Sequence, residues 1–417
     1  MSKNKYNWRS GATLEDHSRR KLKVIREYFS DYLSIRCQLP QRGSFRLAIV
    51  DGFSGGGRYS CGTAGSPILF IEELRASTIA LNLGRVAKGL KEIQIECLLI
   101  FCDDDPCAID SLRENAEPLL AEIKECVPKL YIHNEYLNSD FTDAYLDIIR
   151  IIQQGSFQNL IFNLDQYGHS AVPLYRLVDI MAISRSVEIF YTFAIQALIS
   201  FLDKGNPSSL QKKLNFLGLT RPELQALEQQ LTRHEWLGAA ERLVFETFKS
   251  SAAYVSPFSI NNPDGWRYWL LHFANSFRAR QAYNNILHKN SGEQAHFGRS
   301  GLSMHSYDPS KNGQLYLFDG SARQLALEQL YDDIPRVVSS TGDAMPVGEF
   351  YEGIYNTTPA HSDDINSSMI QNEDIQIVTA NGGERRTAAN INPLDIIRLR
   401  KQRSFFPIFR RGQKHDE

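Results

Sequence analysis

Short apolar runs alternate with amphipathic stretches along the chain, and this alternation predicts strands followed by helices. The stretches between the runs carry apolar residues at helical spacing, as in the segment at 141–154. Strands separated by helices are typical of a mostly parallel α/β sheet. The runs with the length of buried strands lie at residues 47–50, 95–101, 129–133, 159–164 and 187–195.

Two later apolar runs, at 253–260 and 266–275, are separated by Asn-Pro-Asp-Gly at 262–265. This turn chemistry predicts an antiparallel hairpin that closes the sheet. The expected fold is therefore a Rossmann-like sheet with seven strands and a terminal antiparallel pair. A polar helical insertion is expected at 202–250.

A different pattern follows the segment at 289–320, which is expected to be a linker. Helical spacing recurs three times and is followed by two short strands with a basic loop between them. Three helices and a hairpin with arginines at its tip predict a winged-helix-like domain that contacts phosphates. A small dimerisation or packing domain is the alternative. The helices are expected at 322–339, 347–355 and 362–372, and the strands at 374–379 and 396–402.

The expected domains follow from these patterns. An N-terminal helix is followed by the Rossmann-like domain, the linker, the winged-helix-like domain and a charged tail. Their boundaries are 1–40, 41–288, 289–320, 321–410 and 411–417.

Composition places the protein in an ordinary class. Of its 417 residues, 42% are hydrophobic and 23% are charged, which is typical of a water-soluble globular protein. The longest apolar stretch, 187–202, is interrupted by Gln196 and is short for a membrane span. The six cysteines form no CxxC pair and the histidines are scattered, so no metal site is expected. A cytoplasmic protein with reduced thiols is the expectation.

The net charge of −2 hides an uneven distribution. Residues 1–26 carry a net charge of +6 and residues 384–414 carry +7, so the middle of the chain is strongly acidic. Basic ends on an acidic body are expected of a protein that holds a polyanion at defined places. Ordinary solvated tails are the alternative for either end. The arginines and lysine assigned to nucleic acid are Arg385, Arg386, Arg400, Lys401 and Arg403.

The most informative segment is a glycine-rich turn after the first strand. An acidic residue ends the strand, and glycines follow four and six positions later. Glycines in such a turn let a ligand approach the backbone at the carboxyl end of a parallel strand. The spacing resembles the first motif of S-adenosylmethionine-dependent methyltransferases, in which this loop holds the methionine end of the cofactor. The residues assigned to the cofactor here are Asp51, Gly52, Phe53, Gly55 and Gly57.

The combination of HSRRKL at 17–22 with VDGFSGGGRYSCGTAGSP at 50–67 resembles the bacterial three-Cys-motif partner family, TcmP. It is more distantly similar to the large-subunit rRNA adenine-N6 methyltransferases. The resemblance runs from about residue 8 to residue 400. It implies a Rossmann-like fold of the class I methyltransferase type and a neighbouring protein with a three-cysteine motif.

Further cofactor contacts are expected from the next strands and from the first helix. Asp103 ends the second strand, where a carboxylate accepts from both ribose hydroxyls. The alternative for this residue, and for each of the two aspartates that follow it, is a cap of the next helix. The third strand is expected to end at Asn134 and Glu135, and Glu135 is assigned to the adenine amine. His17 and Lys21 share a helix face and are assigned to the cofactor. The substrate, or solvent, is an alternative for that pair.

The fourth strand delivers Asp165-Gln166-Tyr167. Amine methyltransferases place a carboxylate or amide here to accept from the exocyclic amine, with an aromatic ring that stacks on the flipped base. Asp165 and Tyr167 are assigned these catalytic roles, although Gln166 stands where these families usually have a proline. The prediction is an S-adenosylmethionine-dependent methyltransferase acting on nucleic acid. The alternative is a non-catalytic subunit that docks on nucleic acid or a partner enzyme.

Overall fold

The computed structural model describes residues 8, 11–166, 168–201, 212, 214–219, 233–261, 267–290, 295–296, 302, 316–317 and 320–400. The chain divides into two compact units, one of residues 1–299 and 305–319, the other of residues 300–304 and 320–417. Each unit is described by itself. Among the described residues, no helix is both long enough and apolar enough to cross a membrane.

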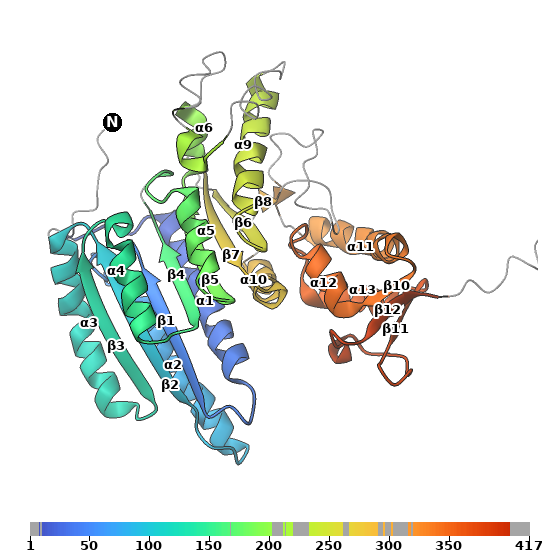
Figure 1. The fold of residues 1–417 in the computed structure, drawn as a ribbon, viewed down its shortest axis with the longest axis horizontal. Helices are drawn as coiled ribbons and strands as arrows, with labels where there is room; N and C mark the ends of the chain where they lie inside the picture. Colours follow the sequence, from blue (N-terminus) through green and yellow to red (C-terminus); the bar gives the residue numbers. More distant parts are fainter. Residues whose placement is uncertain are drawn as a thin grey trace, which may run out of the picture. The chain divides into compact units, whose positions relative to one another are not determined.

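A seven-stranded sheet forms the centre of the first unit (Figure 1). Its strand order is β3-β2-β1-β4-β5-β7-β6, and β7 runs antiparallel to both of its neighbours. The predicted seven-stranded sheet with a terminal antiparallel hairpin is confirmed. The strands are β1 (Ser44–Asp51), β2 (Gln94–Asp103), β3 (Leu130–Asn138), β4 (Asn159–Leu164), β5 (Ser186–Phe193), β6 (Tyr254–Asn261) and β7 (Arg267–Ala274).

Helices cover both faces of this sheet, and each face has its own apolar core. One core packs α1, α2, α3 and α10 against the sheet, and the other packs α4, α5, α6 and α9. The helices are α1 (Asp16–Cys37), α2 (Ser66–Ala87), α3 (Pro106–Cys126), α4 (Phe141–Gln154), α5 (Leu174–Ala182), α6 (Ile195–Phe201), α9 (Arg233–Lys249) and α10 (Phe277–Lys289). Short elements are the 3-10 helix η1 (Asn215–Leu217) and the paired strands β8 (Ala295–His296) and β9 (Tyr316–Leu317).

Helix α1 is fastened to the sheet by a buried polar contact. The Tyr28 hydroxyl donates to Glu188 on β5, and His272 Nε2 on β7 lies 3.0 Å from the same carboxylate oxygen. Burial lowers the pKa of His272, so its neutral form is favoured. The contact therefore fixes α1 against β5 and β7.

The third strand is longer than predicted. It continues to Asn138, so the prediction that it ends at Asn134 and Glu135 is wrong. His133 and Glu135 are exposed because they lie on the open side of an edge strand, where polar residues alternate with partly buried ones. Polarity there marks the exposed face of the strand rather than its end.

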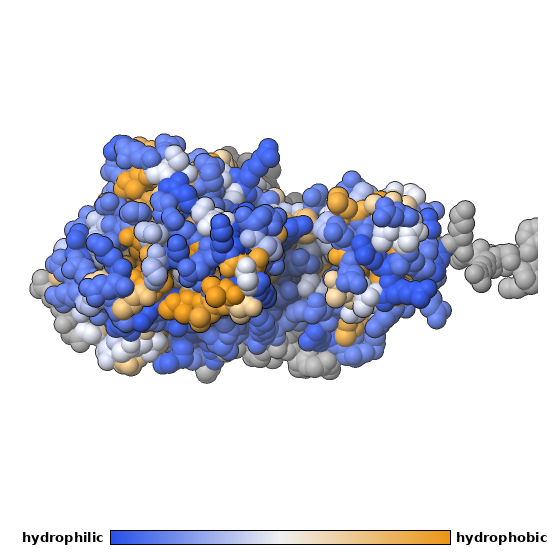
Figure 2. Space-filling view, turned by 90° about the horizontal axis from the view of Figure 1, so that it is seen from below, coloured by the Kyte–Doolittle hydropathy of each residue, from blue (hydrophilic) through white to orange (hydrophobic). Residues whose placement is uncertain are grey.

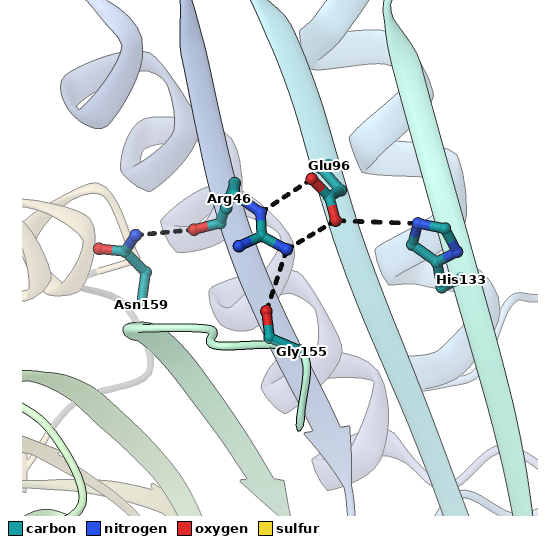
Figure 3. Close-up of polar contacts among 5 residues, drawn as sticks. All are labelled: Arg46, Glu96, His133, Gly155 and Asn159. Carbon is teal, nitrogen blue, oxygen red and sulfur yellow. Dashed lines mark hydrogen bonds and ion pairs between the residues drawn. The ribbon is translucent and has the colours of Figure 1, made fainter. Parts of the chain in front are cut away.

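A polar cluster covers the amino-terminal part of this sheet face, with residues from the four neighbouring strands β3, β2, β1 and β4 (Figure 3). The Arg46 guanidinium donates to both oxygens of Glu96 at 2.8 Å and to the Gly155 carbonyl at 3.0 Å. His133 Nε2 lies 3.8 Å from Glu96, and Asn159 donates to the Arg46 carbonyl. The cluster therefore pairs charged side chains of neighbouring strands at a place where they face solvent.

Buried Arg85 ties the ends of α1 and α2 together. Its guanidinium donates to the backbone carbonyls of Cys37, Leu39, Pro40, Arg42 and Lys91. A view from below shows apolar side chains gathered on the surface of the molecule (Figure 2). The large apolar side chains exposed near the ends of these two helices are Ile35, Leu39, Leu83 and Val86.

The second unit combines three helices with a small antiparallel sheet of order β10-β12-β11. The order of elements is that of a winged helix, so the predicted fold of this region is confirmed. The elements are α11 (Gly320–Ser340), β10 (Ala344–Pro346), α12 (Val347–Ile354), α13 (Ser362–Gln371), β11 (Ile375–Val378), the 3-10 helix η5 (Ala388–Asn390) and β12 (Ile396–Leu399).

Several sequence predictions fall outside the described residues. They include the turn at 262–265, most of the linker at 289–320, residues 202–211 and 220–232 of the insertion, and the tail at 411–417.

Candidate functional site

Three predicted carboxylates lie at one edge of the sheet. Asp51 ends β1, Asp103 ends β2 and Asp165 directly follows β4. Because β2, β1 and β4 are parallel neighbours, their carboxyl ends meet at this edge. This is where ligands bind in open parallel sheets.

Asp51 is fully buried beneath the loop that follows it. Its Oδ1 accepts from the Asn163 side-chain amide of β4 at 3.1 Å. Burial raises the pKa of Asp51 to about 7, against the lowering effect of hydrogen bonds from Ser66 and Asn163. The charge of Asp165 also raises it, which places the two carboxylates in electrostatic contact.

The glycine loop is held by Asp103 from the next strand. The Gly55 backbone N–H donates to Asp103 Oδ2 at 2.9 Å, and Oδ1 accepts from the Asp105 backbone at 3.0 Å. Asp105 itself caps α3 by accepting from the Cys107 N–H at 2.9 Å. The capping role that was open to each of the three successive aspartates thus falls to Asp105, and Asp103 faces the loop. Burial raises the pKa of Asp103.

The indole of Trp8 lies on the glycine loop. A Cβ at Gly55 would be 2.4 Å from Trp8 Cζ2, and one at Gly56 would be 2.6 Å from Trp8 Cε3. Gly55 also has φ +60° and Gly57 has φ +82°, conformations that favour glycine. The protein's own packing therefore requires these glycines, whether or not a cofactor binds.

Two other predicted cofactor residues pack within the protein. A Cβ at Gly52 would lie 2.8 Å from both Leu164 and Phe141. The ring of Phe53 lies 6.1 Å from that of Phe141, measured between centroids. Glu135 is exposed within β3, three residues before its end. Its contact with adenine stays a prediction.

His17 and Lys21 are both buried, so the solvent-facing alternative is wrong. The Lys21 ammonium donates to Asp165 Oδ1 and forms an ion pair with it. The ring of His17 stacks on Tyr268 of β7, with centroids 4.1 Å apart and planes 5° apart. The face of α1 that carries both residues therefore meets the ends of β4 and β7.

Gln166 occupies the position where a proline was expected. Its side-chain oxygen accepts from the backbone N–H groups of Ala171 and Val172 at 2.8 and 3.0 Å, and its amide donates to the Thr192 carbonyl at 3.2 Å. The buried side chain therefore shapes the turn after Asp165 by hydrogen bonding instead of by a ring. Tyr167 lies outside the described residues.

Sequence reasoning missed Trp8, Asn163, Gln166 and Tyr268 as parts of this edge. Asn163 carried a signal, because it is a polar residue inside the apolar run at 159–164. The other three act through contacts between distant segments, which periodicity does not reveal. Among the described residues, no group of three or more His, Cys, Asp or Glu side chains is arranged to hold a metal.

The arginines of the winged-helix unit are largely paired within it. Arg385 donates to both oxygens of Asp395 at 2.8 and 3.1 Å, and Arg400 pairs with Glu384. Arg386 is exposed and makes no hydrogen bond or ion pair within the described part of the chain. Lys401 and Arg403 lie outside that part.

Comparison with known protein families gives one finding for this unit. Residues 306–382 match the family model described as the GMT-like wHTH domain. The C-terminal unit is a winged helix-turn-helix domain. The match covers less than a fifth of the chain and includes none of the carboxylates at the sheet edge. No curated protein matches the sequence. A winged helix-turn-helix domain is a common nucleic-acid-binding module.

Proposed function

We propose that the first unit is an S-adenosylmethionine-dependent methyltransferase domain. The observation that carries this proposal is the strand order β3-β2-β1-β4-β5-β7-β6 with β7 antiparallel. This is the sheet of the methyltransferases that the sequence resembles. Carboxylates at the ends of β1, β2 and β4 support it, because a cofactor with ribose hydroxyls and positive charge needs acceptors there.

The residues present fit this cofactor. Asp103 is partly exposed at the sheet edge, and each of its oxygens keeps a lone pair after accepting from one backbone N–H, so it is suited to the ribose hydroxyls. The glycine loop, which lies over the buried Asp51, would hold the methionine end. When bound, S-adenosylmethionine supplies an activated methyl group.

The proposed substrate is an exocyclic amine of a nucleic-acid base. Asp165 would accept a hydrogen bond from this amine, so that the nitrogen lone pair faces the methyl donor. Gln166 holds the turn in place. The winged helix-turn-helix domain would recruit the nucleic acid.

A second candidate is a non-catalytic subunit, as the resemblance to the three-Cys-motif partner family implies. A specific observation favours it. Helix α13, which is the second helix of the helix-turn-helix, carries Asp363 and Asp364 and has no Lys or Arg. Such a helix is poorly suited to the phosphates of a groove. It is better suited to a basic partner protein.

Calorimetric titration with S-adenosylmethionine tests the cofactor proposal. We expect binding by the intact chain and at least a tenfold loss of affinity in Asp103→Ala, because the acceptor for the ribose is removed. Asp104→Ala, at the exposed neighbouring carboxylate, is the matched control and should bind normally. Absence of binding by the intact chain would contradict the proposal and favour the docking subunit.

If the cofactor binds, transfer of a labelled methyl group to RNA and DNA pools tests the activity. Label in nucleic acid that is lost in Asp165→Ala, with S-adenosylmethionine affinity retained, is the expected result. Unchanged label in that variant would show that Asp165 has no part in the reaction.

A further inference from the structure

The ion pair between Lys21 and Asp165 joins the N-terminal helix to the proposed amine site. Lys21 is 3% exposed, whereas the Asp165 side chain is 28% exposed. The lysine is thus enclosed by protein and the carboxylate is open on one side. Within the described residues, Asp165 Oδ1 accepts from Lys21, and Oδ2 has no hydrogen bond.

An enclosed ammonium has few alternatives to this partner. Burying a lysine without a counter-charge carries a large desolvation penalty, so the pair is strongly favoured once α1 is in place. Helix α1 is itself fixed, because Tyr28 donates to Glu188 two turns further along. The position of the Lys21 ammonium therefore follows from the packing of the helix.

We propose that Lys21 is a positioning residue for methyl transfer. It fixes Oδ1 of Asp165, which leaves Oδ2 to accept from the target amine. This role rests on the proposed function of the first unit. This role explains why the Asp165 carboxylate is held by a residue of α1. The neighbouring Gln166 is not available for it, because its side-chain amide donates to the Thr192 carbonyl.

A second carboxylate lies near this pair. Asp51 of β1 is close enough for the charge of Asp165 to raise its pKa. From α1, Lys21 contacts Asp165, and His17 lies one turn earlier against Tyr268 of β7. Lys21 thus places a positive charge beside Asp165 at an edge where a second carboxylate, Asp51, lies close.

The test compares kcat with KM for labelled-methyl transfer to the nucleic-acid pool. In Lys21→Met we expect kcat to fall about tenfold or more, with the affinity for S-adenosylmethionine retained, because the acceptor is no longer held toward the target amine. Lys21→Arg should restore kcat at least in part. Lys23→Met, on the exposed side of the same helix, should leave kcat and KM unchanged.

Asp165→Asn separates this role from a structural one. The amide oxygen can still accept a hydrogen bond but forms no ion pair, so adding Lys21→Met to Asp165→Asn should lower kcat by less than Lys21→Met lowers it in the wild type. If Lys21→Met fails to fold, Lys21→Gln replaces it. An active protein whose kcat is the same in wild type and Lys21→Met would overturn the inference while leaving the proposed function standing.

A second test of the Lys21–Asp165 pair measures stability and does not depend on methyl-transfer activity. In urea unfolding, Lys21→Met and Asp165→Asn should each lower the midpoint, and the double variant should lose less than the sum of the two. Strict additivity would show that the pair is not coupled and would overturn the inference. Coupling in a chain that binds S-adenosylmethionine but transfers no methyl group would instead overturn the proposed function, and the positioning role with it.

Discussion

Asp51 is the residue whose environment differs most from that of an ordinary carboxyl at the sheet edge. Its pKa is raised to about 7 by burial, so folding favours the protonated form. A carboxyl whose pKa is higher in the folded than in the unfolded chain makes stability fall as pH rises between the two values. Between its ordinary value of 3.8 and about 7, Asp51 should therefore destabilise the fold progressively.

This leads to a prediction for Asp51→Asn. The variant should lack this part of the pH dependence, so its stability relative to wild type should rise by a few kcal/mol at most from pH 5 to pH 8. Urea unfolding at several pH values measures it. Asp110→Asn, at an exposed position of α3, is the control. Parallel curves for wild type and Asp51→Asn would mean that Asp51 ionises normally.

Single residues were predictable where the chain's local pattern marks them. Asp51, Asp103 and Asp165 each follow an apolar run, and the ends of parallel strands meet at one edge. The roles of Trp8 and Gln166 were not predictable, because each depends on what a distant segment places beside it. Glu135 shows the opposite error, since a polar residue on an exposed strand face resembles the end of a strand.

At the scale of elements, α1 depends on its polar anchor as well as on its apolar face. In Tyr28→Phe, Glu188 loses a hydrogen bond but keeps His272. We expect a loss of roughly 1.5–3 kcal/mol in the free energy of unfolding, as for a hydrogen bond to a charged group. Urea unfolding measures it. Tyr131→Phe, on exposed β3, should change stability by less than about 0.5 kcal/mol.

Most helices and strands were predictable because their apolar periodicity agrees with their burial. Helix α4 and strand β4 have the predicted boundaries. The ends of helices and strands do not follow from periodicity, because they are set by capping residues and by strand pairing. Strand β3 continues because β2 beside it offers partners up to Asp103, which is paired with Asn138. That information lies in another segment of the chain.

At the scale of the whole molecule, the winged helix-turn-helix domain is more acidic than its arginines suggest. Residues 320–400 contain 6 Arg and 12 Asp or Glu. The pairing of Arg385 with Asp395 and of Arg400 with Glu384 leaves less positive charge for a polyanion. Contacts with phosphates are therefore expected at the few arginines that have no carboxylate partner.

Arg386 is the test position in this domain. If the chain binds nucleic acid through the wing, Arg386→Ala should weaken binding to duplex DNA and reduce the slope of log affinity against log salt by about one. Arg336→Ala, which breaks a pair with Asp333 on α11, should leave the slope unchanged. If the double variant Asp363→Asn, Asp364→Asn binds DNA more tightly and Arg386→Ala has no effect, the DNA contacts α13 instead of the wing.

The contact between Trp8 and the glycine loop has a consequence for observing the protein. Indole emission responds to its surroundings, and Trp8 is partly exposed, whereas Trp236 and Trp269 are 1% and 0% exposed. A ligand that binds at the loop would change the fluorescence of Trp8 more than the fluorescence of the two buried rings. The side chain that makes Gly55 and Gly56 necessary thus gives the loop a natural optical label.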